Sequence, residues 1–267
     1  MPISTSEAII VKVCVLASSS SGNSTLIRTE RTCLLVDVGL SKRDILARLA
    51  AADETPESLS AILITHEHSD HVCGVVALAK QFNLPIFITP LTARAIAWGE
   101  YSPALDSFQA GTTFSVGDIE VDSFTIPHDA IDPVGFCFRS QGIKIGLVTD
   151  LGYLTDSIKF HLRGADLLML ESNHDLEMLK VGPYPWSVKQ RVMGRKGHLS
   201  NDLVSDFIQR DLDSSITTLV LGHLSEHNNH PEIVRNTASR ALQKAGRSLF
   251  TRLVVAEPRR QTEAFIY

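Results

Sequence analysis

The sequence predicts an α/β fold with two β-sheets whose outer faces are covered by helices. Short apolar segments of strand-like composition recur along the chain, and some alternate with segments that have helical spacing. The predicted order is strands, one crossover helix, hairpins, and then strands alternating with helices, which two covered sheets would satisfy. We expect residues 1–267 to form a single domain, because no stretch has the composition of a linker.

Each predicted element follows from a local pattern. Ser41 is a suitable cap for a helix that runs to about residue 51, and Gly117-Asp118 is a suitable turn for a hairpin. The predicted strands cover residues 11–16, 25–28, 33–38, 61–64, 85–88, 113–116, 119–126, 134–139, 144–149, 167–170, 218–221 and 253–255. The predicted helices cover residues 41–51, 72–82, 92–98, 185–193, 201–210 and 231–244.

Composition is that of an ordinary globular protein, with 44% hydrophobic and 21% charged residues. The net charge of −5 argues against nucleic-acid binding by bulk charge alone, although a local basic patch remains open. The four cysteines are scattered and form no Cys-x-x-Cys pair, which favours free thiols over disulfides. Residues 1–7 lack a basic region followed by an apolar stretch, and no segment is long enough to span a bilayer. We therefore expect a cytoplasmic protein with no membrane partner.

The segment that carries most chemical information is Thr65-His66-Glu67-His68-Ser69-Asp70-His71, which follows the apolar strand at residues 61–64. His66 and His68 are two residues apart and project to the same side of an extended chain, so both can bind one ion. Asp70 and His71 can then reach a second ion, since paired ions lie about 3.5 to 4 Å apart. The alternative is a solvated polar loop, which three histidines at ligand spacing disfavour.

Three further candidate ligands repeat the arrangement of an apolar strand, a ligand and a loop. These are His128, Asp150 and His223, which follow or end the strands near residues 126, 149 and 221. Each one alone has an ordinary interpretation as a capping or surface residue. Together they supply the additional nitrogen and oxygen donors that two ions require.

This combination of His-x-His-x-Asp-His with a distant His, Asp and His resembles the metallo-β-lactamase superfamily over almost the whole chain. The resemblance implies an αββα sandwich of two mixed β-sheets flanked by helices. It also implies two divalent ions, which could be Zn, Mn or Fe. His66, His68 and His128 would hold the first ion, Asp70, His71 and His223 the second, and Asp150 would bridge them. An Asp at the bridging position is typical of the di-metal hydrolases and disfavours β-lactam hydrolysis.

Four other segments resemble the bacterial YycJ (WalJ) proteins, a family regarded as DNA-processing exonucleases. They are residues 16–23, 171–175, 197–201 and 222–228. Gly197-His198-Leu199-Ser200 also resembles the Gly-His-Ser element of tRNase Z, whose His assists phosphodiester cleavage. The resemblance implies a metal-dependent phosphodiesterase, more specifically a DNA exonuclease, with nucleic acid as its partner and DNA favoured over RNA.

We expect three residues to carry the chemistry. Asp70 would orient the attacking hydroxide, His198 would assist the leaving oxygen, and Glu171 would orient His198. An alternative for His198 is a purely structural residue beside the helix cap Ser200.

Substrate contacts are expected from two regions of the chain. The first comprises Ser21 and Asn23 of the serine-rich loop at residues 17–24, together with His174 and His227, although a flexible linker and ordinary surface residues are the competing interpretations. The second is a basic segment before His198 that could contact a nucleic-acid backbone or form a solvated helical face. It contains Lys180, Lys189, Arg191, Arg195 and Lys196, with Tyr184 and Trp186 available for base stacking.

Other functions stay open at this point. The first is a hydrolase of a lactone, a thioester or a cyclic phosphodiester, which the acidic net charge favours. A diiron redox protein is the second, although such members normally carry an attached flavin domain and none is evident in the sequence. A non-catalytic binding module is the third, and the complete ligand set disfavours it.

Overall fold

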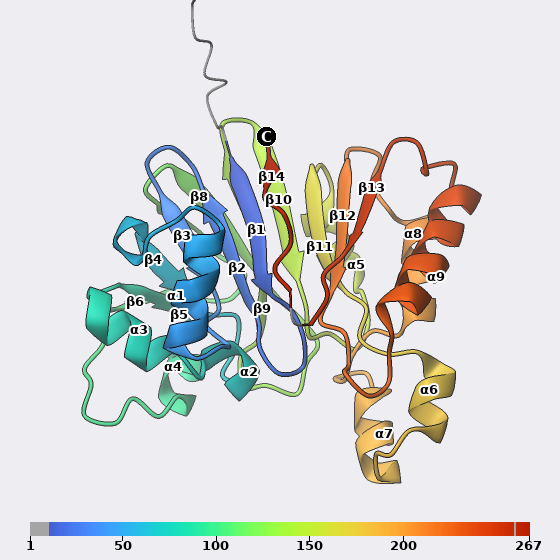
Figure 1. Cartoon of the computed structure of the whole chain (residues 1–267), viewed down its shortest axis with the longest axis horizontal. Coiled ribbons are helices and arrows are strands. Elements are labelled where there is room, and N and C mark those ends of the chain that lie inside the picture. The colour runs from blue at the N-terminus through green and yellow to red at the C-terminus, as the bar shows by residue number, and fades with distance from the viewer. Residues whose placement is uncertain (1–10, 259) are drawn as a thin grey trace, which may run out of the picture.

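The computed structural model describes residues 11–258 and 260–267, so residues 1–7, where we expected no targeting segment, lie outside it. Within the described residues the chain forms two seven-stranded sheets that face each other, with helices on both outer sides (Figure 1). The αββα sandwich of two mixed sheets predicted from the sequence is therefore confirmed. None of the helices within the described ranges has the length and apolarity needed to cross a membrane.

The first sheet has the order β14-β1-β2-β3-β4-β5-β6. Its strands are β1 (Lys12–Ala17), β2 (Ser24–Arg28), β3 (Cys33–Val36), β4 (Ala61–Leu63), β5 (Ile86–Ile88), β6 (Leu105–Ser107) and β14 (Phe265–Ile266). Strands β3 to β6 are parallel, whereas β14, β1, β2 and β3 pair antiparallel.

The second sheet has the order β13-β12-β11-β10-β9-β8-β7. Its strands are β7 (Thr113–Val116), β8 (Ile119–Thr125), β9 (Val134–Ser140), β10 (Ile143–Val148), β11 (Leu167–Glu171), β12 (Thr218–Gly222) and β13 (Arg252–Val255). Strands β10 to β13 are parallel, and β7 to β10 form an antiparallel meander. Strand β8 therefore runs in the same direction as β10.

The helices begin where capping residues satisfy their first N–H groups, as Ser41, Thr89, Thr155, Asp175 and Ser200 do. They are α1 (Lys42–Ala51), α2 (Ser69–Val72), α3 (Val75–Phe82), α4 (Pro90–Ala95), α5 (Asp156–Leu162), α6 (Leu176–Val181), α7 (Trp186–Val192), α8 (Asn201–Arg210) and α9 (Pro231–Lys244), with a short 3₁₀ helix at Pro56–Ser58.

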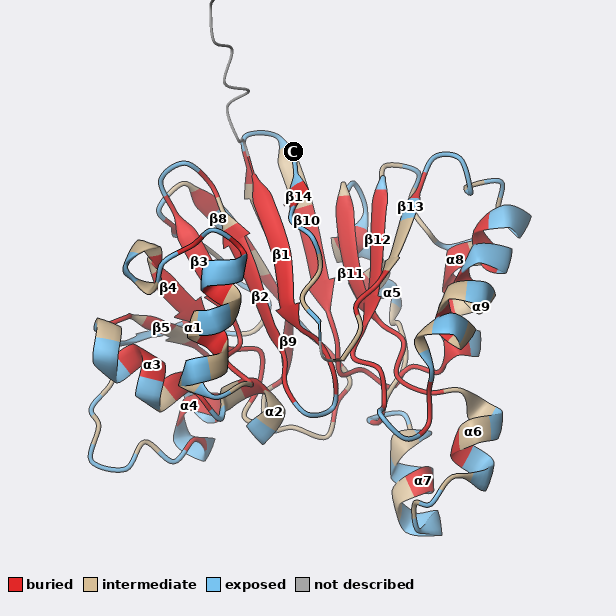
Figure 2. Ribbon diagram, in the orientation of Figure 1, coloured by how far each residue is buried: buried red, intermediate tan, exposed pale blue. Residues whose placement is uncertain are grey.

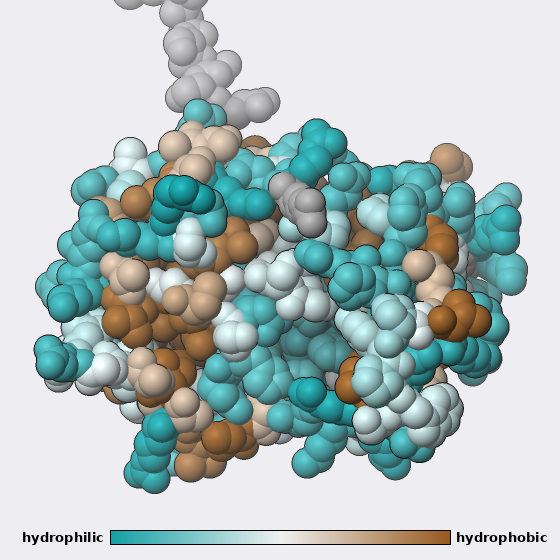
Figure 3. Space-filling model, turned by 60° about the horizontal axis from the view of Figure 1, so that its bottom comes forward, coloured by the Kyte–Doolittle hydropathy of each residue, from teal (hydrophilic) through white to brown (hydrophobic). Residues whose placement is uncertain are grey.

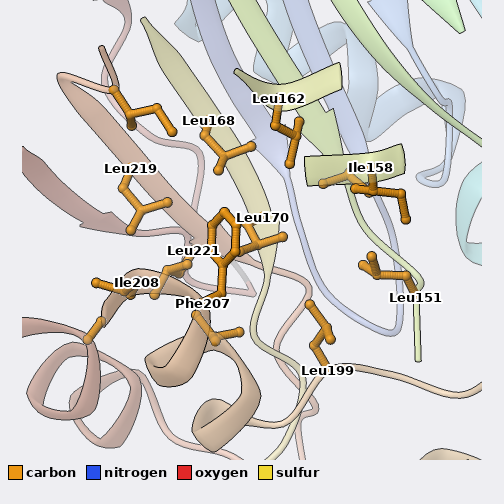
Figure 4. Packing of buried hydrophobic residues seen from close by; sticks show 14 of the residues in the cluster. Leu151, Ile158, Leu162, Leu168, Leu170, Leu199, Phe207, Ile208, Leu219 and Leu221 are labelled. Carbon is orange, nitrogen blue, oxygen red and sulfur yellow. The ribbon is translucent and has the colours of Figure 1, made fainter. Parts of the chain in front are cut away.

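Side-chain alternation along the strands builds three cores. In β3, Leu34 and Val36 point into the core between the sheets, whereas Leu35 packs beneath α1 and α3. Figure 2 shows most strands buried, while helices such as α1 and α9 bury one side and expose the other; the edge strands β6, β7 and β13 are more exposed. On the outside of the second sheet, Leu168 and Leu170 of β11 pack against Phe207 of α8, as Figure 4 shows.

Some element boundaries differ from those predicted. The single helix expected at residues 72–82 is divided into α2 and α3 at Gly74. The N–H of Gly74 donates to the carbonyl of Val38, and a Cβ at this position would lie 2.1 Å from the carbonyl oxygen of Leu40. The break thus allows the segment at residues 65–71, which carries four of the predicted ligands, to pack against the loop after β3. Strands β6 and β14 and helices α5 and α6 were not predicted.

The core between the sheets provides a test of this packing. Phe136 of β9 is fully buried there, whereas Phe250 is 67% exposed. Phe136→Ala should lower the free energy of unfolding by about 3–5 kcal/mol. Phe250→Ala, the matched control, should change it by less than about 0.5 kcal/mol. Urea unfolding followed by circular dichroism measures both, and equal losses would contradict the assigned core.

Candidate metal centre

The predicted ligands gather because several strands end at the same edge of the sandwich. Parallel strands place their carboxyl ends together, and the loops after β3, β4, β8, β10, β11 and β12 meet there. These loops carry all seven predicted ligands. At this edge of the molecule, turned toward the viewer in Figure 3, hydrophilic residues occupy the centre, while hydrophobic surface gathers toward the left.

The seven side chains form two groups whose ligand atoms lie within 4.8 Å of one another in each group. The first group is His66, His68 and His128, and the second is Asp70, His71, Asp150 and His223. Asp150 lies between them, with Oδ1 3.4 Å from His223 Nε2 and 3.8 Å from His128 Nε2. These two groups correspond to the ligand sets that the family resemblance implied, and a third, overlapping group joins Asp150 and His223 to Glu171 and His198.

Burial shows that the cluster fits a divalent cation. His66 Nε2, Asp150 Oδ2 and His223 Nε2 are buried and have no hydrogen-bond partner among the described residues. Asp150 Oδ2 lies 3.2 Å from His71 Nε2, but the two atoms are not aligned for a hydrogen bond. Buried polar atoms are costly when unsatisfied, and divalent cations bound by the two groups would satisfy all three.

The electrostatics of the cluster also fit a bound cation. Burial would raise the pKa of the Asp150 carboxyl, but the charges of His223 and His71 hold it well below its usual range. Burial opposes protonation of His223, yet Asp150 and the neighbouring carboxylates raise the pKa of its imidazole to about 10. Protons on histidines therefore balance the buried carboxylates, and a divalent cation would replace those protons.

Two histidines of the first group, His66 and His128, lie in surroundings that favour the neutral imidazole. Burial, together with the nearby His71, lowers the pKa of His66 well below its usual range. Burial also lowers the pKa of His128. Neutral imidazole is the form that coordinates a metal, so these residues need no deprotonation before binding.

Three residues at the site edge share a left-handed backbone conformation. Asp37, Asp150 and His223 have φ of 60°, 60° and 56°, and each follows a strand. This conformation is uncommon for residues with a Cβ and costs about 1–2 kcal/mol. It persists where surrounding contacts hold it: the N–H of His223 donates to Ser18 Oγ, and Asn173 Nδ2 donates to the His223 carbonyl.

Asp37 is a site residue that the sequence analysis missed. Its Oδ2 lies 2.8 Å from His71 Nδ1, and it accepts hydrogen bonds from the N–H and hydroxyl of Thr65. Asp37 thereby fixes the ring of His71 so that Nε2 faces the second group. The signal was available, because Asp37 follows a buried strand as Asp150 does.

Glu171 has a larger role than the one predicted. Its Oε1 lies 2.7 Å from Nδ1 of both His198 and His223, and its Oε2 accepts from the N–H groups of Leu151 and Leu199. Burial alone would raise the pKa of this carboxyl, but the charges and hydrogen bonds of His198 and His223 lower it to about 2. One carboxylate therefore orients both a candidate ligand and the candidate proton donor. Sequence reasoning found the contact with His198 and missed the contact with His223.

His198 lies beside the ligands without belonging to either of the two groups. Burial opposes its protonation, but the charge of Glu171 and their hydrogen bond raise its pKa. Because Glu171 accepts at Nδ1, Nε2 is the ring nitrogen that can act on a substrate.

The predicted substrate-contact residues occupy different environments. Ser21 is exposed and donates to Glu226 Oε1, and His227 is exposed near Tyr184. Asn23 is buried among the ligands: its N–H donates to the Asp70 carbonyl and its Nδ2 lies 3.0 Å from His71 Nε2. His174 is 1% exposed, its backbone forms a bridge with Ser200, and its Nδ1 has no hydrogen-bond partner among the described residues.

The pair formed by Asp37 and His71 generates a prediction. Asp37→Asn should lower affinity for Mn²⁺ or Zn²⁺ by about 10- to 100-fold, because the substituted amide no longer fixes the His71 tautomer. Asp122→Asn is a matched control, since Asp122 Oδ2 also lies against a histidine, 3.2 Å from His161 Nδ1, outside the ligand groups. Isothermal titration calorimetry measures the metal affinity of both variants. Equal metal affinities in the two variants would contradict a role for Asp37 in orienting His71.

Comparison with known proteins agrees with this geometry. Residues 32–223 match the Beta-lactamase superfamily domain. The chain is 39% identical over 239 residues to exodeoxyribonuclease WalJ of Streptococcus pneumoniae, covering 88% of this chain and 89% of that protein. It is 37% identical over 235 residues to exodeoxyribonuclease YycJ of Bacillus anthracis, covering 87% and 89%.

Solved structures share the fold. The metallo-β-lactamase fold protein YhfI from Bacillus subtilis superimposes with a TM-score of 0.74 at 17% identity, covering 96% of this chain and 99% of that one. Human tRNase Z, short form, gives a TM-score of 0.60 at 19% identity, covering 80% and 93%. With the identity to the two exodeoxyribonucleases, these matches show that the chain belongs to the β-lactamase superfamily, among the WalJ and YycJ proteins.

Proposed function

We propose that this protein is a DNA exonuclease that uses two divalent ions. The observation that carries the proposal is the convergence of two ligand groups on the bridging position of Asp150, with the His198–Glu171 pair beside them. The names of the two relatives that match most of the chain support phosphodiester hydrolysis of DNA.

The residues assigned to each ion follow the two groups. His66, His68 and His128 would hold one ion; Asp70, His71 and His223 would hold the other; and Asp150 would contact both. Such a pair lowers the pKa of a bound water and neutralises the charge that develops on a phosphate. Imidazole and carboxylate donors suit zinc, manganese or iron, and availability decides among them.

The chain's own residues would orient and protonate the substrate. In the proposal Asp70 accepts a hydrogen bond from the attacking water and so fixes its direction. His198 donates a proton from Nε2 to the leaving oxygen of the phosphodiester. Glu171 keeps the Nδ1 proton of His198 in place and stabilises the positive charge of the ring before the transfer.

We also propose that the chain forms a single domain and that the protein is cytoplasmic. The buried core between the sheets contains residues of both sheets, which supports the single domain expected for residues 1–267 within the part of the chain that the structure describes. All four cysteines are free, and a DNA substrate with free thiols suits the cytoplasm.

Chelation tests the dependence on metal. Treatment with EDTA should abolish degradation of end-labelled linear DNA, and added Mn²⁺ or Zn²⁺ should restore it. A covalently closed circular DNA of the same sequence should remain intact, because an exonuclease requires an end. Cleavage of the circle would contradict the exonuclease assignment. Turnover of a lactone or thioester without any turnover of DNA would favour the small-molecule alternative.

Replacement of His198 tests its assigned role. His198→Ala should lower kcat by about 10²- to 10⁴-fold while the bound metal content stays at the wild-type level. His161→Ala is the matched control, because His161 also pairs with a carboxylate but lies outside the ligand groups. Metal analysis and single-turnover kinetics measure both effects. Wild-type kcat in His198→Ala would show that this histidine is structural.

A further inference from the structure

We propose that helices α6 and α7 with the loop to Gly197 form a binding arm for single-stranded DNA, and this inference rests on the proposed function. The helical arm comprises residues 176–196. It projects from the edge of the second sheet that carries the ligand loops (Figure 1). Its charge, its exposed aromatic side chains and its attachments to the site support this role.

The charge of the arm is opposite to that of the protein. Residues 176–196 contain five basic residues and one acidic residue, Glu177, whereas the whole chain carries −5. Lys189 is buried with its ammonium donating to the Lys180 carbonyl, and Lys180 and Arg191 pair with carboxylates, so the unpaired surface charge is that of the last two basic residues. Lys196 and Arg195 have no ion-pair partner within the described part of the chain, and both are exposed. A polyanion is the partner that this local basic patch on an acidic protein fits.

The arm also exposes aromatic surface. Trp186 begins α7 and is 63% exposed, and Tyr184 is half-buried with its ring 6.0 Å from that of His227. Exposed aromatic rings next to basic side chains are the combination that binds unpaired bases by stacking while cations contact the phosphates. Bases are accessible for stacking in a single strand, so we assign single-stranded DNA as the occupant.

The arm contacts three loops that carry candidate ligands. Arg191 pairs with Asp129, and the Gly197 carbonyl lies 3.3 Å from His128 Nδ1.

The guanidinium of Arg195 lies 4.6 Å from the centre of the Tyr153 ring, in the loop after Asp150. A Cβ on Gly182 would lie 2.3 Å from Asn228 Oδ1, in the loop after His223. A DNA strand bound along the arm would therefore extend to the ligand cluster.

Fluorescence of Trp186 tests the contact directly, because the chain has two tryptophans. A Trp98→Phe, His198→Ala variant with its ions retained leaves Trp186 as the reporter. Titration with an oligothymidylate of about 16 nucleotides should quench its emission in parallel with binding measured by anisotropy. A Trp186→Phe, His198→Ala variant, which keeps Trp98, should show no quenching. Binding without any change in Trp186 emission would overturn the proposal.

Kinetics separate a binding role from damage to the site. Trp186→Ala should raise KM for single-stranded DNA by about 5- to 100-fold with kcat little changed. Its turnover of a small aryl phosphodiester, which cannot reach the arm, should equal that of the wild type. Phe250→Ala is the matched control, since Phe250 is 67% exposed and precedes β13, at the sheet edge opposite to His223. Equal loss on both substrates, or no loss on DNA, would overturn the proposal.

Salt dependence tests the cationic part. Lys196→Ala should reduce the slope of log affinity against log salt by about 1, whereas Lys244→Ala on the far end of α9 should leave it unchanged. An identical slope in Lys196→Ala and wild type would contradict the phosphate contact.

If the wild type degrades no DNA with any ion, the proposed function fails; the fluorescence titration then still decides whether the arm binds DNA. If the wild type degrades DNA and Trp186→Ala has the same KM for DNA, the proposed binding role of the arm is wrong while the proposed function stands.

Discussion

The buried carboxylate of Asp150 sets the main constraint on this structure. It is 2% exposed, lies between His128 and His223, and has one oxygen without a hydrogen-bond partner among the described residues. A desolvated carboxylate is unfavourable unless positive charge is close, and the protein surrounds it with imidazoles. Burial opposes protonation, but the charge of Asp150 raises the pKa of His71 and His223, so these two imidazoles hold protons that a bound cation would replace. The centre therefore acquires its stable charge distribution by binding cations.

The two-sheet architecture makes this concentration of charge possible. The strand ends of both sheets meet at one edge, and each core beneath them is packed with apolar side chains. The ordering then extends outward through hydrogen bonds from carboxylates to histidines. Asp37 orients His71, and Glu171 orients His198 and His223 together. The helical arm contacts the same ligand loops, through Arg191 with Asp129 and Arg195 with Tyr153.

The fold class and the positions of the seven candidate ligands could be predicted from the sequence, because each ligand follows an apolar strand. The same rule applied to Asp37 would have found it. Other features were not accessible. The break at Gly74 depends on the approach of Leu40, which is distant in sequence, and the shared role of Glu171 requires that His198 and His223 meet. His174 is polar and lies near site loops in sequence, yet its side chain is buried and its backbone forms a bridge with Ser200.

The central claim is that two divalent ions occupy the cluster on either side of Asp150. Anomalous diffraction from crystals grown with Mn²⁺ or Zn²⁺ measures this most directly. The account predicts two peaks about 3.5 to 4 Å apart. One peak should be surrounded by His66, His68 and His128, and the other by Asp70, His71 and His223, with Asp150 in contact with both. A single peak, or peaks away from these side chains, would contradict it.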